Sequence, residues 1–217
     1  MSQTILPGME TMTARTLTTD DLKHVGIMRR YQNTSFAAIE ADERGIPDNV
    51  KVNYQKIKHY AEDIDSKIHD GVGLVLSGDY GTMKTTLAVA VLRHWLERGI
   101  MSRGMFVPMC SLIDNLFTMR SGDREEWARY ENRIRNTTLL VIDDLGGELA
   151  GGQEWVLSKV DSIITERYNK MLPVIITTNF NKEQLVNSYS GRLIDRIRSS
   201  CVMLTFHGHS QRRNAEA

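Results

Sequence analysis

Residues 78–85, GDYGTMKT, have the composition of a loop that binds phosphate. They fit the pattern G-x-x-x-x-G-K-[ST] at Gly78, Lys84 and Thr85, while Met83 stands at the second glycine position. In such a loop the backbone N–H groups surround the β-phosphate, the lysine reaches the β- and γ-phosphates, and the threonine hydroxyl binds Mg²⁺. The stretch therefore predicts a site for a nucleoside triphosphate and Mg²⁺.

Met83 is the departure from this pattern. A side chain in the left-handed conformation that glycine tolerates costs about 1 kcal/mol. Gly78 and Gly81 remain, and the backbone donors do not depend on side chains. We expect the loop to keep its fold, with weakened or altered nucleotide binding. The alternative, a glycine-rich turn with an incidental lysine, is disfavoured because an apolar run precedes the loop and a helical pattern, TTLAVAVLRHWL, follows it.

Two acids follow another apolar run. The stretch TLLVIDD ends in Asp143 and Asp144. In P-loop nucleotide hydrolases such a strand carries the carboxylate that holds Mg²⁺. We assign this role to Asp143, acting through water, and activation of the attacking water to Asp144. Alone the two acids are equally typical of a surface turn, and their pairing with Lys84 and Thr85 favours the catalytic interpretation.

A third polar cluster follows PVIITT, where Thr178 and Asn179 come at a strand end and could contact the γ-phosphate or the attacking water. Further on, Arg192 and Arg196 are four residues apart on one helical face. An arginine here either forms surface ion pairs or completes the site of a neighbouring subunit by stabilising charge on the transferred phosphoryl group.

Apolar runs alternate with helical patterns from residue 72 onward. The runs are 72–76, 104–109, 138–142, 173–178 and 201–206, and the helical segments lie near 85–98, 111–120, 123–135, 153–170 and 181–198. Continuous β-branched runs indicate strands that are buried on both faces. We predict an α/β fold, a parallel sheet of about five strands covered by helices on both faces.

Composition restricts the other possibilities. The chain has 217 residues and a formal net charge of zero, so a nucleic-acid contact would need a local basic patch. Two cysteines without a disulfide framework suit a reducing compartment. We see neither a signal peptide nor a membrane-spanning run and expect a cytoplasmic protein.

The first part of the chain has a different pattern. We expect residues 1–32 to form a flexible or partner-binding arm and 33–217 the nucleotide-binding domain, with a minimal or absent C-terminal lid. An amphipathic helix is predicted over 51–70. Its apolar positions are Val52, Tyr54, Ile57, Tyr60, Ala61, Ile64 and Ile68.

Taken in order, these motifs resemble the helicase-loader branch of the AAA+ ATPases, the DnaC and IstB-like ATP-binding proteins. The resemblance extends from about Asn33 to Arg212. It is carried by YQNTSF, GDYGTMKTTLAVAVL, FVPMCSLIDNL, LLVIDDLGGE, VIITTN and GRLIDRI. It implies a P-loop fold of the ASCE class, with the Walker A motif at 78–85 and Walker B at Asp143 and Asp144.

The resemblance also assigns roles to individual residues. It implies catalytic roles for Lys84, Asp144, Asn179 (sensor 1) and Arg196 (arginine finger), and Mg²⁺ binding by Thr85 and Asp143. ATP would be bound by Gly78, Asp79, Tyr80, Gly81, Thr82, Met83, Lys84, Thr85, Thr86 and, near the second sensor position, Arg212.

The implied partners are a replicative helicase, single-stranded DNA and further copies of the chain, with Arg196 acting in trans. Three functions stay open: a helicase loader in DNA replication, an IstB-like transposition helper on duplex DNA, and a nucleotide-gated adaptor with little turnover. The segment ahead of the matching region is shorter than the domain by which loaders grip the helicase.

A candidate DNA-binding segment lies within residues 120–135. Its arginines are Arg120, Arg124, Arg129, Arg133 and Arg135, and four acids are interleaved with them. This interleaving favours a solvated helix with ion pairs over a DNA-binding stripe. Trp127 and Tyr130 could stack on bases, but we favour a packing role for both.

Overall fold

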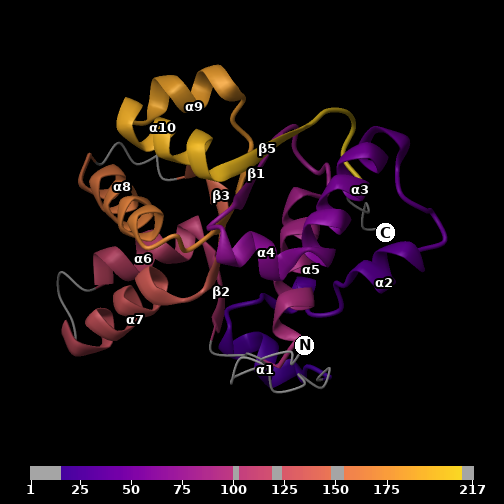
Figure 1. Cartoon of the computed structure of the whole chain (residues 1–217), viewed down its shortest axis with the longest axis horizontal. Helices are drawn as coiled ribbons and strands as arrows, with labels where there is room; N and C mark the ends of the chain where they lie inside the picture. The colour runs from indigo at the N-terminus through magenta and orange to yellow at the C-terminus, as the bar shows by residue number, and fades with distance from the viewer. Residues whose placement is uncertain (1–15, 100–102, 119–123, 148–153, 212–217) are drawn as a thin grey trace, which may run out of the picture.

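A single parallel sheet lies between two layers of helices (Figure 1). The computed structural model describes residues 16–99, 103–118, 124–147 and 154–211. The strands are β1 (Gly73–Gly78), β2 (Gly104–Pro108), β3 (Leu139–Leu145), β4 (Val174–Thr178) and β5 (Cys201–Phe206). The predicted α/β fold with five parallel strands is confirmed.

The order of the strands brings the three polar motifs together. Across the sheet the order is β2-β3-β4-β1-β5, so β4 lies between β1 and β3. All neighbouring pairs are parallel, so β1, β3 and β4 end on the same side of the sheet, and their carboxyl ends lie next to one another. Ligands of such sheets bind at the carboxyl ends of the strands.

The helices divide between the two faces. One face carries α1 (Thr19–His24), α2 (Phe36–Glu40), α3 (Asp48–Glu62), α4 (Ile64–His69) and α5 (Lys84–Leu96). The other carries α6 (Met109–Thr118), α7 (Arg124–Asn136), α8 (Glu154–Asn169), α9 (Lys182–Ser188) and α10 (Gly191–Ser200). Strand residues alternate between the layers: Leu74 and Leu76 of β1 join the first core, and Val75 joins the second.

Two helix predictions are corrected by the structure. The helix predicted over 51–70 is two helices, α3 and α4, with Asp63 between them. Val52 is 65% exposed, so its assignment to the buried face is wrong, and Val50 is buried instead. The segment 181–198 is likewise divided into α9 and α10, because a second helix begins where the Ser190 side chain accepts the backbone N–H of Leu193.

The segment before residue 33 covers one edge of the sheet. The backbone N–H of Phe106, in edge strand β2, donates to the carbonyl of Val25 at 2.7 Å. Gly26 has φ 90° and lies so close to Phe106 that a Cβ would clash with its carbonyl oxygen. Leu22 and Val25 are buried in the first core. Within the expected arm, the segment 17–27 thus packs against the first core and the β2 edge, and residues 1–15 lie outside the described residues.

The opposite edge, β5, is covered by α3. The side-chain amides of Asn49 and Asn53 donate to the carbonyls of His207 and Thr205 at 2.6 and 2.7 Å. The bond to Thr205 satisfies a carbonyl group of the edge strand that would otherwise face solvent or another chain, and the bond to His207 holds the residue just after the strand.

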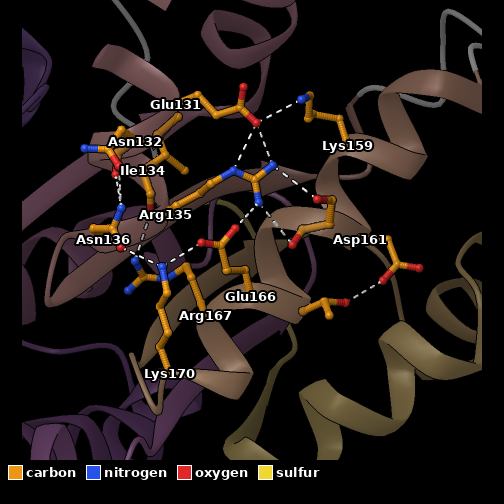
Figure 2. A network of polar contacts seen from close by, with 12 residues as sticks. Glu131, Asn132, Ile134, Arg135, Asn136, Lys159, Asp161, Glu166, Arg167 and Lys170 are labelled. Atoms are coloured by element: carbon orange, nitrogen blue, oxygen red, sulfur yellow. Dashed lines mark hydrogen bonds and ion pairs between the residues drawn. The ribbon is translucent and has the colours of Figure 1, made fainter. Parts of the chain in front are cut away.

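Ionic contacts join α7 to α8 (Figure 2). Glu131 accepts from Arg135 at 2.6 Å and from Lys159 at 2.8 Å, and Arg135 also donates to Glu166 at 2.6 Å. Burial raises the pKa of Glu131, but the hydrogen bonds from Lys159 and Arg135 outweigh it and hold that pKa below its usual value. The carboxylate is therefore charged, and the two helices are held together beside the sheet.

Arg167 of α8 is buried and acts as a hydrogen-bond donor to four backbone carbonyls. It bonds the carbonyls of Ile134 and Thr137 at 2.9 and 2.8 Å, and those of Thr138 and Pro173 at 3.3 and 2.8 Å. Burial lowers the pKa of Arg167 to about 9, so the guanidinium remains protonated at neutral pH. It caps the C-terminus of α7 and joins it to the starts of β3 and β4.

Substitution of Arg167 by Met should destabilise the fold by about 3 kcal/mol, because several buried carbonyls would lose their donor. Urea unfolding measures this difference. The matched control is Arg129→Met, at an exposed position on α7, which should change the free energy of unfolding by less than about 0.5 kcal/mol. Equal effects of the two substitutions would contradict the role given to Arg167.

Candidate functional site: the phosphate loop and the adjoining strand ends

The loop after β1 has the backbone conformation that its pattern predicts. Met83 has φ 68° and ψ 9°, so this position is left-handed although it is not glycine. The Met83 side chain packs partly buried against the first core. Helix α5 begins at Lys84 with no side-chain cap, whereas α1, α2, α9 and α10 are capped by side chains. α3 and α4 also lack a side-chain cap, but only α5 begins directly after this loop, so its first N–H groups are available to an anion bound there.

Lys84 lies inside the loop. It is 6% exposed, and its Nζ donates to the carbonyls of Gly78 at 2.8 Å and Asp79 at 2.6 Å. An ammonium group held within the loop by backbone carbonyls is placed to exchange some of these contacts for phosphate oxygens. The structure thus places Lys84 where a phosphate-binding lysine is expected.

Asp143 connects three elements. Its Oδ1 accepts the hydroxyl of Thr85 at 2.8 Å and the hydroxyl of Thr177 at 2.6 Å. The side chain is 7% exposed, and burial raises the pKa of Asp143 above its usual value, while the bonds from Thr177 and Thr85 counteract part of that rise. The predicted pair, Thr85 and Asp143, is therefore in direct contact.

Asp144 and Asn179 also meet. The side-chain amide of Asn179 donates to Asp144 Oδ1 at 2.6 Å. Asp144 has φ 62° and an exposed side chain, in contrast to the buried Asp143. Aspartate tolerates the left-handed region better than most residues do. The two acids of the motif are thus presented differently, one buried beside Thr85 and one open to solvent beside Asn179.

Thr177 was missed by the sequence reasoning, which named Thr178 instead. The hydroxyl of Thr177 donates to Asp143 and accepts the backbone N–H of Asp144 at 2.9 Å. Thr178 is fully buried and bonds the carbonyl of Leu145 at 2.6 Å. The available signal was the period of two in a strand, by which neighbouring threonines face opposite sides.

The rest of the loop is held by the segment after β5. The backbone N–H of Gly208 donates to the Asp79 carboxylate at 2.9 Å, and the backbone N–H of Gln211 donates to the carbonyl of Gly81 at 2.8 Å. Thr82 is buried and donates to the carbonyl of Asp79.

The remaining predicted nucleotide ligands differ in their surroundings. Tyr80 is 69% exposed at the tip of the loop. Thr86 is half-buried in the first turn of α5. Arg212 lies outside the described residues.

Arg196 is not part of this cluster within one chain. It lies on α10, and its Nη1 donates to the hydroxyl of Thr165 on α8 at 2.6 Å. Arg192, one turn earlier, is exposed. Among the described contacts, none joins either arginine to the loop or to the acids after β3.

The arginine-rich segment is used in packing where the structure describes it. Arg133 bonds the carbonyl of His24, and Arg135 bonds Glu131 and Glu166. Trp127 and Tyr130 pack partly buried against the second core. These contacts support the interpretation as an ion-paired helix. Arg120 lies outside the described residues, as does the side chain of Arg124.

The donor set fits Mg²⁺ bound together with a nucleotide. A hydroxyl and a carboxylate oxygen, from Thr85 and Asp143, lie 2.8 Å apart beside the uncapped start of α5. In nucleotide sites Mg²⁺ takes one or two protein ligands and completes its shell with phosphate and water. Within the described ranges, no group of three or more His, Cys, Asp or Glu side chains could hold a metal.

The strand order, the loop and the two acids define an AAA+ P-loop NTPase. The family model of the IstB-like ATP binding protein matches residues 51–217, and the chain belongs to this family. No helix in the described part of the chain is long and apolar enough to span a membrane.

Curated and solved relatives agree with this assignment. The chain is 27% identical over 176 residues to the replicative helicase loader DnaC of Escherichia coli (strain K12), a match that covers 80% of this chain and 66% of that protein. The chain thus spans just under two thirds of that relative.

Two solved structures share the fold. The crystal structure of the DnaC helicase loader has 26% sequence identity and a TM-score of 0.68, covering 83% of this chain and 100% of that one. The crystal structure of DnaI has 22% identity and a TM-score of 0.67, covering 84% of this chain and 96% of that one. The chain is therefore a DnaC/IstB-like AAA+ protein.

Two substitutions of Met83 isolate the free-energy cost of its left-handed backbone from the stabilisation that its side chain gains by packing. Met83→Gly and Met83→Ala both remove the packed side chain, but only glycine also relieves the left-handed conformation. We expect the glycine variant to be more stable than the alanine variant by about 1 kcal/mol. Urea unfolding of both variants tests this, and a more stable alanine variant would show that position 83 is not left-handed.

Proposed function

We propose that the chain binds ATP with Mg²⁺ at residues 78–86 and hydrolyses it. The observation that carries the proposal is the contact between Thr85 and Asp143, made at the start of α5 and beside the buried Lys84. A turn with an incidental lysine would have no reason to bury that lysine or to hold a hydroxyl against a buried carboxylate.

The residues of the chain divide the chemistry among them. Lys84 and the first N–H groups of α5 would bind the β- and γ-phosphates, and Thr85 and Asp143 would hold Mg²⁺. Bound Mg²⁺ would neutralise charge that develops on the phosphate oxygens. Asp144 accepts a proton from the attacking water, and Asn179, which already bonds Asp144, fixes the direction of that carboxylate.

The remaining cation comes from another subunit in this proposal. Arg196 makes no described contact with its own loop, and an arginine that reaches the γ-phosphate from a neighbouring copy would complete the site. Arg212 would serve as the second sensor within the same chain. The active form is then a homo-oligomer with nucleotide between subunits.

For the biological role, we propose a helicase loader that acts in DNA replication on single-stranded DNA together with a replicative helicase. The support is the 27% identity to the E. coli helicase loader DnaC. The family assignment keeps a second candidate, an IstB-like transposition helper that acts on duplex DNA. The third candidate, an adaptor that binds nucleotide with little turnover, is supported by Met83 in the loop.

The central test is ATP binding and hydrolysis by the purified chain and by Lys84→Ala. We expect the variant to bind ATP at least about tenfold more weakly and to lose turnover about a hundredfold or more, because a buried charged donor to phosphate is lost. Lys182→Ala, at an exposed lysine of α9, is the matched control and should behave as the parent chain. Equal ATP binding by the Lys84 and Lys182 variants would exclude a nucleotide site at this loop.

DNA stimulation distinguishes the candidate roles. Turnover is measured with single-stranded oligothymidylate and with a duplex of equal length. A loader should be stimulated by the single strand, whereas stronger stimulation by the duplex would favour the transposition helper. The adaptor would bind ATP tightly and show no turnover with either DNA, and Met83→Gly would restore its turnover.

A further inference from the structure

A hydrogen-bonded chain connects α8 to α10 outside the nucleotide site. Asp161 of α8, labelled in Figure 2, accepts the hydroxyl of Ser190 at 2.9 Å through Oδ2 and that of Thr165 at 3.0 Å through Oδ1. The Thr165 hydroxyl in turn accepts Arg196 Nη1 at 2.6 Å. Ser190 is the N-cap of α10, so both ends of the chain of bonds lie on the helix that carries Arg196.

Each bond in this chain has a fixed direction. The Thr165 hydroxyl has one proton, and since it donates that proton to Asp161, its oxygen lone pairs face Arg196. The direct distance from Arg196 Nη1 to Asp161 Oδ1 is longer, 3.5 Å. The threonine hydroxyl is therefore the group that holds the guanidinium, and the carboxylate orients the hydroxyl.

Only one nitrogen of the guanidinium is held. Among the described residues, neither Nε nor Nη2 of Arg196 makes a hydrogen bond, and neither is buried without a partner. The Nε and Nη2 N–H groups form one edge of the planar fork, the edge that binds two oxygens of a carboxylate or phosphate in parallel. The Arg196 side chain is 19% exposed, and anchoring through Nη1 leaves this edge without a hydrogen-bond partner among the described residues.

We propose that Thr165, oriented by Asp161, is a positioning residue that presents the Nε–Nη2 edge of Arg196 to the γ-phosphate bound by a neighbouring subunit. This inference rests on the trans role proposed for Arg196. The bond to Thr165 removes rotamer freedom from a long side chain before the subunits meet, so less ordering is required in the transition state. The Ser190 hydroxyl donates to the same carboxylate, so Asp161 also holds the start of α10, the helix that carries Arg196.

The test uses mixtures of two full-length variants with ATP and single-stranded oligothymidylate. Lys84→Ala supplies Arg196 but lacks a working loop, and Arg196→Ala supplies a working loop but lacks the arginine. Each alone should be nearly inactive, and the mixture should regain turnover if the arginine acts in trans. Thr165→Val, which is close in shape and lacks the hydroxyl, is then added to one partner at a time.

In the subunit that supplies Arg196, Thr165→Val should lower the kcat of the mixture about tenfold with an unchanged KM for ATP. In the subunit that supplies the loop, it should have no effect. Thr165→Ser, which keeps a hydroxyl, should restore most of the rate. Asp161→Asn is a second, independent variant and should lower kcat in the same subunit only.

The outcomes separate this inference from the proposed function. No turnover in the mixture of Lys84→Ala and Arg196→Ala would refute the trans role and the positioning role with it. A working mixture that Thr165→Val does not slow would refute the positioning role alone. Equal slowing from either subunit, or a changed KM, would show that Thr165 only supports the fold.

Discussion

The site depends on one buried carboxylate. Asp143 Oδ1 accepts two hydroxyl protons, from Thr85 of α5 and Thr177 of β4, and this shared oxygen connects three elements that are distant in sequence. Burial raises the pKa of Asp143 and opposes its ionisation, and the two donors offset part of that cost. An acid in this position is stable only where the sheet brings both hydroxyls to it. The strand order, with β4 between β1 and β3, is what brings the Thr85 and Thr177 hydroxyls to the same carboxylate oxygen.

The cover on both faces and edges of the sheet holds this geometry. The segment around Val25 closes the β2 edge, and Asn49 and Asn53 of α3 close the β5 edge. On the second face, Arg167 joins the end of α7 to the starts of β3 and β4. Strand β3, which carries the two acids, is thus held just before its first residue by the bonds from Arg167 to backbone carbonyls. Near its end it is held by the hydroxyls that donate to Asp143.

Local patterns were sufficient to predict the strands, the loop and the two acids, because each is encoded in contiguous residues. Long-range contacts were not predictable in this way. The choice between Thr177 and Thr178 depends on which face of β4 meets β3, where the register shifts between Ile142 and Leu145. The contact of Arg196 with Thr165 spans 31 residues and two helices. Val52 has the spacing of a buried helix position but is exposed, since the same helix buries Val50.

Met83 shows why a departure from a motif is not by itself evidence of lost function. Residues persist in rarely populated backbone regions where their surroundings determine the conformation. Here Gly78 on one side and α5 on the other fix the path of the loop, and the Met83 side chain gains contacts with the first core. The conformation that a glycine would adopt is thus kept at a cost of about 1 kcal/mol. In the proposed function the loop binds phosphate through its backbone N–H groups and Lys84. Methionine at position 83 removes none of these donors, so we expect it to affect the stability of the loop and the approach of the phosphates.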